Sequence, residues 1–320
     1  TIAAANGQSI YLDSANTFSN TVAFSSAGTL ANVTIIDSND FDLAALTLSG
    51  NLIATSTGGS ITDSGALRIS GTSLFITSTS NKDIALDTTT NAFTGAVTLN
   101  TTGLTGHAEV DGGTTILDIA ASTVGGNLSL TSGHATGITD SGTVTVGGNL
   151  IATNDVSNGD INMGSLAVDG TIALTTSGSG GDVTLVNDAG LNFAASTVGG
   201  NLAATATTGN MTDSGALVIT GVTTIAAGSG NNITLDHTSN DFQGALQITS
   251  GNNVTLVDAG AIDLGASTVS GTYAVTATAS GDITNSGVLA ITNGATFKVD
   301  NGRSITLNQS NTFSSTVTFT

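Results

Sequence analysis

The sequence contains no cysteine, proline or tryptophan, and it is poor in charge. Without cysteine, the chain can build neither a disulfide framework nor a thiolate metal site. Charged residues make up 8% of its 320 residues, whereas a typical soluble domain has about 25%. The composition is therefore not that of an ordinary globular protein.

Basic residues are especially scarce, because 23 acidic residues face only Arg68, Lys82, Lys298 and Arg303, for a net charge of -19. Such a chain cannot neutralise many phosphates, which argues against nucleic-acid binding. An anionic membrane surface would repel it for the same reason. The charge leaves divalent cations and neutral sugars as permitted partners.

Long apolar runs are also missing. No segment approaches the roughly 18–20 residues of a membrane span. Residues 1–30 contain neither a basic segment nor a continuous apolar segment of the kind that forms a signal peptide. We therefore expect a mature chain or an excised part of a longer one.

Apolar residues are nevertheless plentiful, at 39% of the chain with a mean hydropathy of +0.28. Disordered chains usually lack apolar residues, so this composition argues against disorder. Val, Ile, Leu and Phe recur in short bursts, which indicates a core built from many small pieces.

One phrase, TDSG, recurs along the chain and places Asp63, Asp140, Asp213 and Asn285 in register, at spacings of 77, 73 and 72 residues. Two further phrases share this period: LSGNL and its variants at 48, 124, 198 and 269, and the I-x-L phrase at 10, 84, 161, 233 and 305. Three independent markers predict a super-repeat of about 74 residues.

The beginning and end of the sequence are copies of one another. Residues 6–24 match residues 301–319 at 12 of 19 positions. We expect one continuous segment, residues 1–320, that is an interior slice of a longer array. Its super-repeats would run over 6–80, 81–157, 158–228 and 229–300, with a fifth beginning at 301–320.

Each super-repeat divides into three lines of short alternating apolar and polar runs, joined by Gly, Asn, Asp and Ser. Period-two alternation with β-branched residues is typical of strands, and no segment keeps a helical apolar spacing. The pattern predicts an all-β parallel β-solenoid with three strands and about 25 residues per coil, and three coils per super-repeat. We expect Ile84, Leu86 and their equivalents to stack inward, and Phe18, Phe93, Phe242 and Phe313 to fill a corner of the core.

The phrases STVGGNL (196–202), ATATTGNMTDSGAL (204–217) and GTVTVGGNLIAT (142–153) resemble the repeat regions of filamentous haemagglutinin-like exoproteins, which are bacterial surface adhesins of two-partner secretion systems. The resemblance covers essentially the whole chain. It implies a right-handed β-helix that projects from the cell and mediates adhesion. The amino-terminal Asn-Pro-Asn-Gly type motif of such proteins is absent, because the chain has no proline.

Two features could bind calcium. The TDSG aspartates recur about three coils apart, too far for two copies to share an ion, so we interpret them as turn residues that hydrogen-bond their own backbone. Asp37, Asp40 and Asp42 could hold an ion loosely, but a solvated acidic turn is the favoured interpretation. GSGGDV (178–183) is a lone, imperfect version of a calcium-binding repeat.

Nothing in the sequence predicts catalysis. His107, His134 and His237 are far apart, and no GxSxG, HExxH or GxGxxG motif occurs. We therefore expect no enzyme and assign no catalytic, cofactor-binding or metal-binding residue. A polysaccharide-degrading β-helix is a less favoured alternative, because the chain has no Trp, two Tyr and four basic residues with which to hold a sugar. Ice binding is less favoured, because the Thr-x-Thr runs at 55–57, 88–90 and 205–207 do not recur once per coil at one offset. The seven N-x-[ST] sequons are interpreted as Asn turns that precede strands.

The sequence thus predicts the structural shaft of a bacterial extracellular adhesin or filament at the cell surface, with other copies or adjacent repeats as partners. The alternative is a β-helix module that binds carbohydrate or a receptor. Such a module should break the repeat, and the largest irregularity is residues 101–113, which contain His107 and Glu109.

Overall fold

The computed structural model describes residues 1–279 and 281–320. This described part is all-β, with no helix, and hence no helix that could cross a membrane. It divides into a first unit, Thr1–Val156 with Ser165–Gly170, and a second unit, Ser157–Gly164 with Thr171–Thr320. Each unit is a parallel β-solenoid, as the alternation in the sequence predicts.

The strands are short. Those of the first unit are β1 (Ile2–Ala3), β2 (Ile10–Asn16), β3 (Phe24–Ser25), β4 (Val33–Asp37), β5 (Phe41–Leu43), β6 (Leu46–Leu48), β7 (Leu52–Ser56), β8 (Ile61–Asp63), β9 (Leu67–Ile69), β10 (Ser73–Thr77), β11 (Ile84–Leu86), β12 (Ala92–Phe93), β13 (Val97–Asn100), β14 (Ala108–Asp111), β15 (Leu117–Ile119), β16 (Ser122–Val124), β17 (Leu128–Ser132), β18 (Ile138–Asp140) and β19 (Val144–Val146). β20 (Leu150–Ser157) and β21 (Ile161–Val168) contain residues of both units.

The second unit also contains a mixture of longer and shorter strands. They are β22 (Thr171–Ser177), β23 (Val183–Asn187), β24 (Leu191–Phe193), β25 (Ser196–Val198), β26 (Leu202–Ala206), β27 (Met211–Asp213), β28 (Leu217–Ile219), β29 (Thr223–Ala226), β30 (Ile233–Leu235), β31 (Asp241–Phe242), β32 (Leu246–Ser250), β33 (Val254–Asp258), β34 (Ile262–Leu264), β35 (Ser267–Val269), β36 (Tyr273–Ala277), β37 (Ile283–Asn285), β38 (Leu289–Ile291), β39 (Ala295–Val299), β40 (Ile305–Thr306), β41 (Thr312–Phe313) and β42 (Val317–Phe319).

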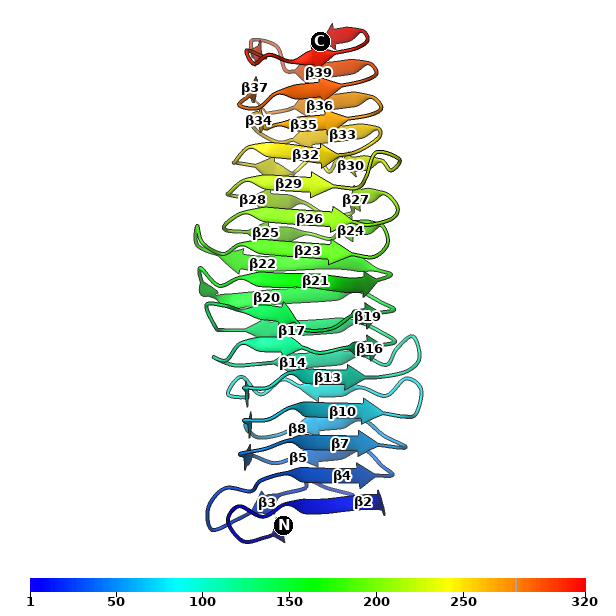
Figure 1. Cartoon of the computed structure of the whole chain (residues 1–320), viewed down its shortest axis with the longest axis vertical. Coiled ribbons are helices and arrows are strands. Elements are labelled where there is room, and N and C mark those ends of the chain that lie inside the picture. Colours follow the sequence, from blue (N-terminus) through cyan, green and yellow to red (C-terminus); the bar gives the residue numbers. More distant parts are fainter. Residues whose placement is uncertain (280) are drawn as a thin grey trace. The chain divides into compact units, whose positions relative to one another are not determined.

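One turn consists of a long strand followed by a pair of short strands. In the first unit, the long strands β4, β7, β10 and β13 stack in register, as Figure 1 shows in blue to teal. Val33 pairs with Leu52, Leu52 with Ser73, and Ser73 with Val97, so these turns contain 19, 21 and 24 residues. The average over the chain is about 22 residues per turn, which is shorter than the 25 that we expected.

The super-repeat does not hold a whole number of turns, which corrects our expectation of three coils. From β4 to β13, which we call the first copy, four long strands alternate with three short pairs. The long strand β14 then follows β13 directly and begins the second copy. The third copy (β23 to β32) and fourth copy (β33 to β42) meet in the same way. Each of these copies therefore spans three and a half turns.

The extra half turn places equivalent strands of successive copies in different sheets. In the first unit, β8 with Asp63 pairs with β5 and β11, whereas β18 with Asp140 pairs with β15, which lies beside β13. In the second unit, β27 pairs with β24 and β30, whereas β37 pairs with β34, which lies beside β32. A long strand of one copy can thus stack on the short pairs of the next.

The core consists of the inward residue of each alternating pair. Ile84, Leu86, Ile233 and Leu235 are at most 1% exposed, as their stacking positions predict. Phe93 and Phe242 are also fully buried, which confirms for them the predicted corner of the core. Phe75 packs edge-on against Phe93, with ring centroids 6.2 Å apart. Aromatic rings in this geometry add to the stabilisation from apolar burial.

Glycine is required where the main chains of successive turns approach at a corner. A Cβ atom on Gly221 would lie 2.5 Å from the carbonyl oxygen of Gly200 on the preceding turn. Because this carbonyl oxygen belongs to the main chain, it could not move away without disrupting the stacking of the two turns. A Cβ atom on Gly230, by contrast, would meet nothing within 4 Å.

We predict that Gly221→Ala destabilises the fold by about 2 kcal/mol or more, because the two turns must separate to admit the methyl group. Gly230→Ala is the matched control and should be neutral or slightly stabilising, since alanine restricts the unfolded chain. Urea unfolding followed by circular dichroism measures both. Equal unfolding midpoints for the two variants would contradict the close approach.

Candidate functional site

The TDSG aspartate joins successive turns. The Nδ2 of Asn91, in the phrase NAF, donates to Oδ2 of Asp63 at 2.7 Å. The Oδ1 of Asn91 accepts the N–H of Leu67 at 2.7 Å, and Leu67 lies on the same turn as Asp63. This three-residue clamp connects the recurring TDSG phrase with the recurring Asn-x-Phe phrase of the following turn. The sequence interpretation, in which the aspartate bonds its own backbone, missed this partner.

The clamp recurs in the second unit. The third copy has Asp213, Asn240 and Leu217, joined by bonds of 2.6 and 2.8 Å. In the fourth copy, Asn285 donates to Asn311 at 2.9 Å, and Asn311 accepts the N–H of Leu289 at 2.9 Å. An amide can therefore replace the carboxylate in this clamp.

The second copy uses a shorter connection. It lacks an Asn-x-Phe phrase, and Oδ2 of Asp140 instead accepts the main-chain N–H of Ser165 at 2.6 Å. In all four copies the residue at this position bonds to the following turn. The recurring phrase is thus part of the scaffold.

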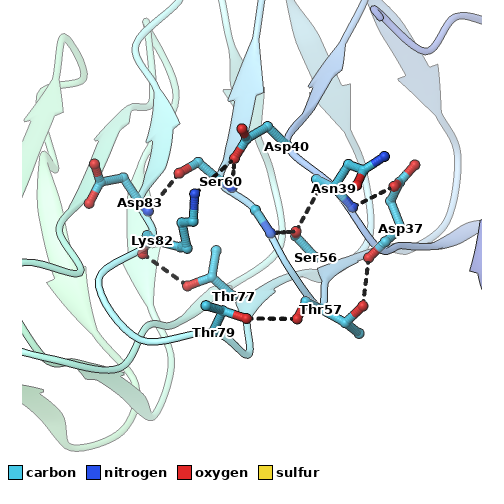
Figure 2. A network of polar contacts seen from close by, with 11 residues as sticks. Asp37, Asn39, Asp40, Ser56, Thr57, Ser60, Thr77, Thr79, Lys82 and Asp83 are labelled. Carbon is cyan, nitrogen blue, oxygen red and sulfur yellow. Dashed lines mark hydrogen bonds and ion pairs between the residues drawn. The ribbon is translucent and has the colours of Figure 1, made fainter. Parts of the chain in front are cut away.

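A second type of contact runs along the corner between the long strands and the short pairs. In the first unit, a side chain on each turn accepts the N–H of the equivalent residue on the next turn, at 2.6 to 3.0 Å. The acceptors and donors in order are Asp40, Ser60, Asp83, His107, Asn127 and Asn149. Figure 2 shows the first part of this corner ladder, with Asp40, Ser60 and Asp83.

The corner ladder satisfies N–H groups at the points where the chain bends out of the sheets. Further ladders of the same kind explain the Asn of the LSGNL and VGGNL phrases, because Oδ1 of Asn51 accepts the N–H of Thr72 at 2.9 Å and Oδ1 of Asn201 accepts that of Val222 at 2.8 Å. Asp182, in GSGGDV, accepts the N–H of Asn201 at 2.7 Å in the same way. Sequons at Asn32, Asn127, Asn210, Asn232 and Asn253 are also ladder positions.

The irregular segment 101–113 belongs to this scaffold as well. Thr101 donates its hydroxyl to the carbonyl of Gly106 at 2.6 Å, which closes a loop around Gly103, whose φ is +85°. His107 is the ladder member that follows this loop, and Glu109 points outward from β14. His134 and His237 accept N–H groups within their own turns. Each of the three histidines thus accepts a different N–H group.

Asp37, Asp40 and Asp42 have separate partners. Asp37 is fully buried and accepts the N–H groups of Phe18 and Asn39 at 2.8 and 2.9 Å. Asp40 belongs to the corner ladder, and Asp42 accepts the hydroxyls of Thr62 and Ser64. Within residues 1–279 and 281–320, no three His, Asp or Glu side chains are placed to hold a metal ion.

One outward column in the second unit is composed largely of threonine, which differs from our expectation. Asn192, Thr212, Thr234, Thr255, Ala274, Thr296 and Thr318 pair in sequence from β24 to β42. The column was not visible at one sequence offset because it combines short strands of the third copy with long strands of the fourth. The residues two positions after Thr212, Thr234, Thr255, Ala274 and Thr296 are Ser214, Asp236, Val257, Thr276 and Lys298. This neighbouring column is therefore not composed of threonine.

A polar groove of about 530 Å³ opens on the first unit beside β5 and β8. Asp40 and Asp42 line it, together with Lys82 from the loop between β10 and β11. Lys82 extends across Ser60 toward Asp40, two turns away, and its Nζ lies 3.5 Å from Oδ1 of Asp40 (Figure 2). This is the strongest candidate for a binding site, and no feature of the sequence predicted that Lys82 would contact Asp40.

Three carboxyl groups have raised pKa values. Burial raises the pKa of Asp258 to about 6, although it accepts the N–H groups of Phe242 and Gly260. Burial also raises the pKa of Asp63 and of Asp111, against the opposing effects of Asn91 and of the N–H of Gly113. Asp37, Asp111 and Asp258 end the first long strand of their copies, and Asn187 holds that position in the third.

The raised pKa values determine the direction in which pH changes the stability of the fold. A carboxyl group with a higher pKa in the folded state binds its proton more tightly there, so folding is favoured below the unfolded pKa and weakened as pH rises through the folded pKa. We predict that the melting temperature rises as the pH falls from 7.5 to about 4.5. For Asp258 the contribution is at most about 3 kcal/mol.

Asp258→Asn should reduce this pH dependence, and Asn187 shows that the position accepts an amide, since its Nδ2 donates to the carbonyl of Gly190 at 2.7 Å. Differential scanning calorimetry between pH 4 and 8 gives the slope for both proteins. A variant that keeps the full slope would exclude Asp258 as its source.

For the clamp, we predict that Asn91→Ala lowers the free energy of unfolding by about 2–4 kcal/mol, because it removes the amide that bonds both the buried carboxylate of Asp63 and the N–H of Leu67. Asp63→Asn should cost less than about 1 kcal/mol, because the fourth copy already uses an Asn–Asn pair. Urea unfolding tests both variants. If Asp63→Asn were the more harmful change, the carboxylate would have a role that the clamp does not explain.

A family model described as repeats of unknown function (DUF5649) matches residues 30–100, 105–157, 180–249 and 251–320. No curated protein and no solved structure matches the chain. The matched segments begin just before the long strands β4, β14, β23 and β33, where a new copy starts. Because they cover more than half of the sequence, the chain belongs to the DUF5649 family of repeats.

Proposed function

We propose that the chain is a non-catalytic structural repeat, the shaft of a bacterial extracellular adhesin or surface filament. One observation carries the proposal: the polar side chains that recur in every copy bond to the next turn of the same solenoid. Asp63, Asp213 and Asn285 belong to clamps, and Asn51, Asn127 and Asn201 belong to corner ladders. A pattern that recurs in this way stabilises the stacking of successive turns.

The half-turn offset supports the same proposal. Each copy ends on a long strand and the next begins on one, so copies can follow one another without a special connection. Turns stack at about 4.8 Å, and a copy of three and a half turns would therefore lengthen the shaft by about 17 Å. Adjacent repeats are the partners that this geometry provides.

The surface chemistry is compatible with an extracellular location. Outward positions carry mainly Thr, Ser, Asn and Ala, and the only ion pair found within residues 1–279 and 281–320 is Lys82 with Asp40. Four basic residues in 320 also give trypsin-like proteases few cleavage sites. The location itself rests on the resemblance to surface adhesins.

The test uses the intact protein in the cells that produce it. Immunogold labelling of unpermeabilised cells should detect the chain outside the envelope. Four added copies of residues 180–249 should lengthen the purified protein by about 70 Å in electron micrographs without loss of its folded state. Labelling that requires permeabilised cells would overturn the extracellular location. A length that does not grow with the number of copies would overturn the shaft.

A further inference from the structure

The polar groove of the first unit differs from the scaffold because its polar groups are not all used in stacking. Oδ1 of Asp40 accepts the N–H of Ser60 and lies 3.5 Å from Nζ of Lys82, while the Asp40 side chain remains 72% exposed. The Lys82 side chain is 34% exposed. Asn20 and Thr21 also line the groove. Hydrogen-bond donors and acceptors thus line one hollow of about 530 Å³, within the usual size of small-molecule sites.

The carboxylates of the groove are held in fixed directions. Asp42 accepts two hydroxyls from β8 and the residue after it, those of Thr62 and Ser64. Asp40 is fixed by the 2.6 Å bond from Ser60 and by the ammonium group of Lys82. Groups that are already oriented lose less entropy when they bind a ligand.

The Asp40–Lys82 pair is also peculiar to the first copy. The residues equivalent to Asp40 in the other copies are Ile116, Gly190 and Ala261, none of which can form the ion pair. The residues equivalent to Lys82 are Gly159, Asn231 and Arg303. A feature that one copy has and the others lack is not required by the stacking of turns.

The charges restrict the ligand. Two carboxylates and a net charge of -19 oppose an anion, and Lys82 beside Asp40 opposes a bare metal cation. Eight of the groove's nine lining residues are polar, and its single aromatic residue, Phe41, is only 3% exposed, so the groove offers an apolar ligand no exposed aromatic ring. An uncharged ligand rich in hydroxyls can donate to the aspartates and accept from Lys82 and Asn20.

We propose that this groove binds a neutral oligosaccharide. Asp40 and Asp42 accept hydrogen bonds from sugar hydroxyls, and Lys82 donates to the adjacent oxygen atoms. No exposed aromatic ring is available to stack on a sugar face, so binding to one groove is weak, and a long surface array would rely on multivalency. This site is additional to the shaft and does not depend on it.

The experiment is NMR titration of the isotope-labelled chain with neutral trisaccharides, namely maltotriose, mannotriose and tri-N-acetylchitotriose, and with trigalacturonic acid as the anionic probe. At least one neutral probe should shift the amide signals of Asn20, Asp42 and Lys82 in a saturable manner, and the anionic probe should not. Failure of all three neutral probes to shift these signals would overturn the proposal.

Variants then assign the effect to the groove. Lys82→Met keeps the aliphatic stem and removes the donor, and Asp42→Asn replaces one carboxylate; each should weaken binding at least tenfold. Asp263→Asn makes the same change at the equivalent position of the fourth copy, where there is no Asp40–Lys82 pair, and should leave binding unchanged. Melting curves check that each variant is folded. Equal binding by the wild type and Asp42→Asn, or an equal loss in Asp263→Asn, would place the ligand elsewhere and refute the assignment.

Discussion

Every turn of this solenoid must present its main-chain N–H and C=O groups in register with the turns on either side. Within the strands, this requirement is met by the parallel ladders. At the corners the chain leaves the sheet, and side-chain oxygen or nitrogen atoms take over as acceptors, as in the ladder from Asp40 to Asn149. The frequent Asn, Asp and Ser of the sequence, and the glycines beside them, follow from this single constraint.

Much of the fold could be predicted from the sequence because the strand pattern is local. Alternation of apolar residues predicts the strands, and their short loops predict parallel stacking. The number of turns per copy could not be predicted, since a long strand and a pair of short strands cover the same width of the solenoid and can stack on one another. Residues 100–108 pass from β13 to β14 without a short pair, and nothing in TTGLTG distinguishes that half turn from a loop.

The candidate site could be predicted only in part, because it too depends on how the turns stack. The sequence drew attention to Asp40 and Asp42, but as ligands for a loosely held ion. Lys82 changes that interpretation, and it lies 42 residues from Asp40 because two turns of unequal length separate them. The partner of the TDSG aspartate could not be predicted either, since Asn91 follows Asp63 by 28 residues. Contacts across turns depend on turn lengths, which vary from 19 to 24 residues in the first copy alone.

The four copies also show which polar groups are tied to stacking and which are not. Asp63 and Asn285 hold the same place in their clamps, and Asp258 and Asn187 hold the same place at a strand end. What these positions require is a hydrogen-bonding group of the right length. A negative charge is dispensable, and burial disfavours it, which raises the pKa of Asp258. Asp40 has no polar equivalent in any other copy, and the lysine that meets it is also unique to the first. In a repeat of this kind, a specific binding site is therefore expected where the side chains of one copy differ from those of the other copies.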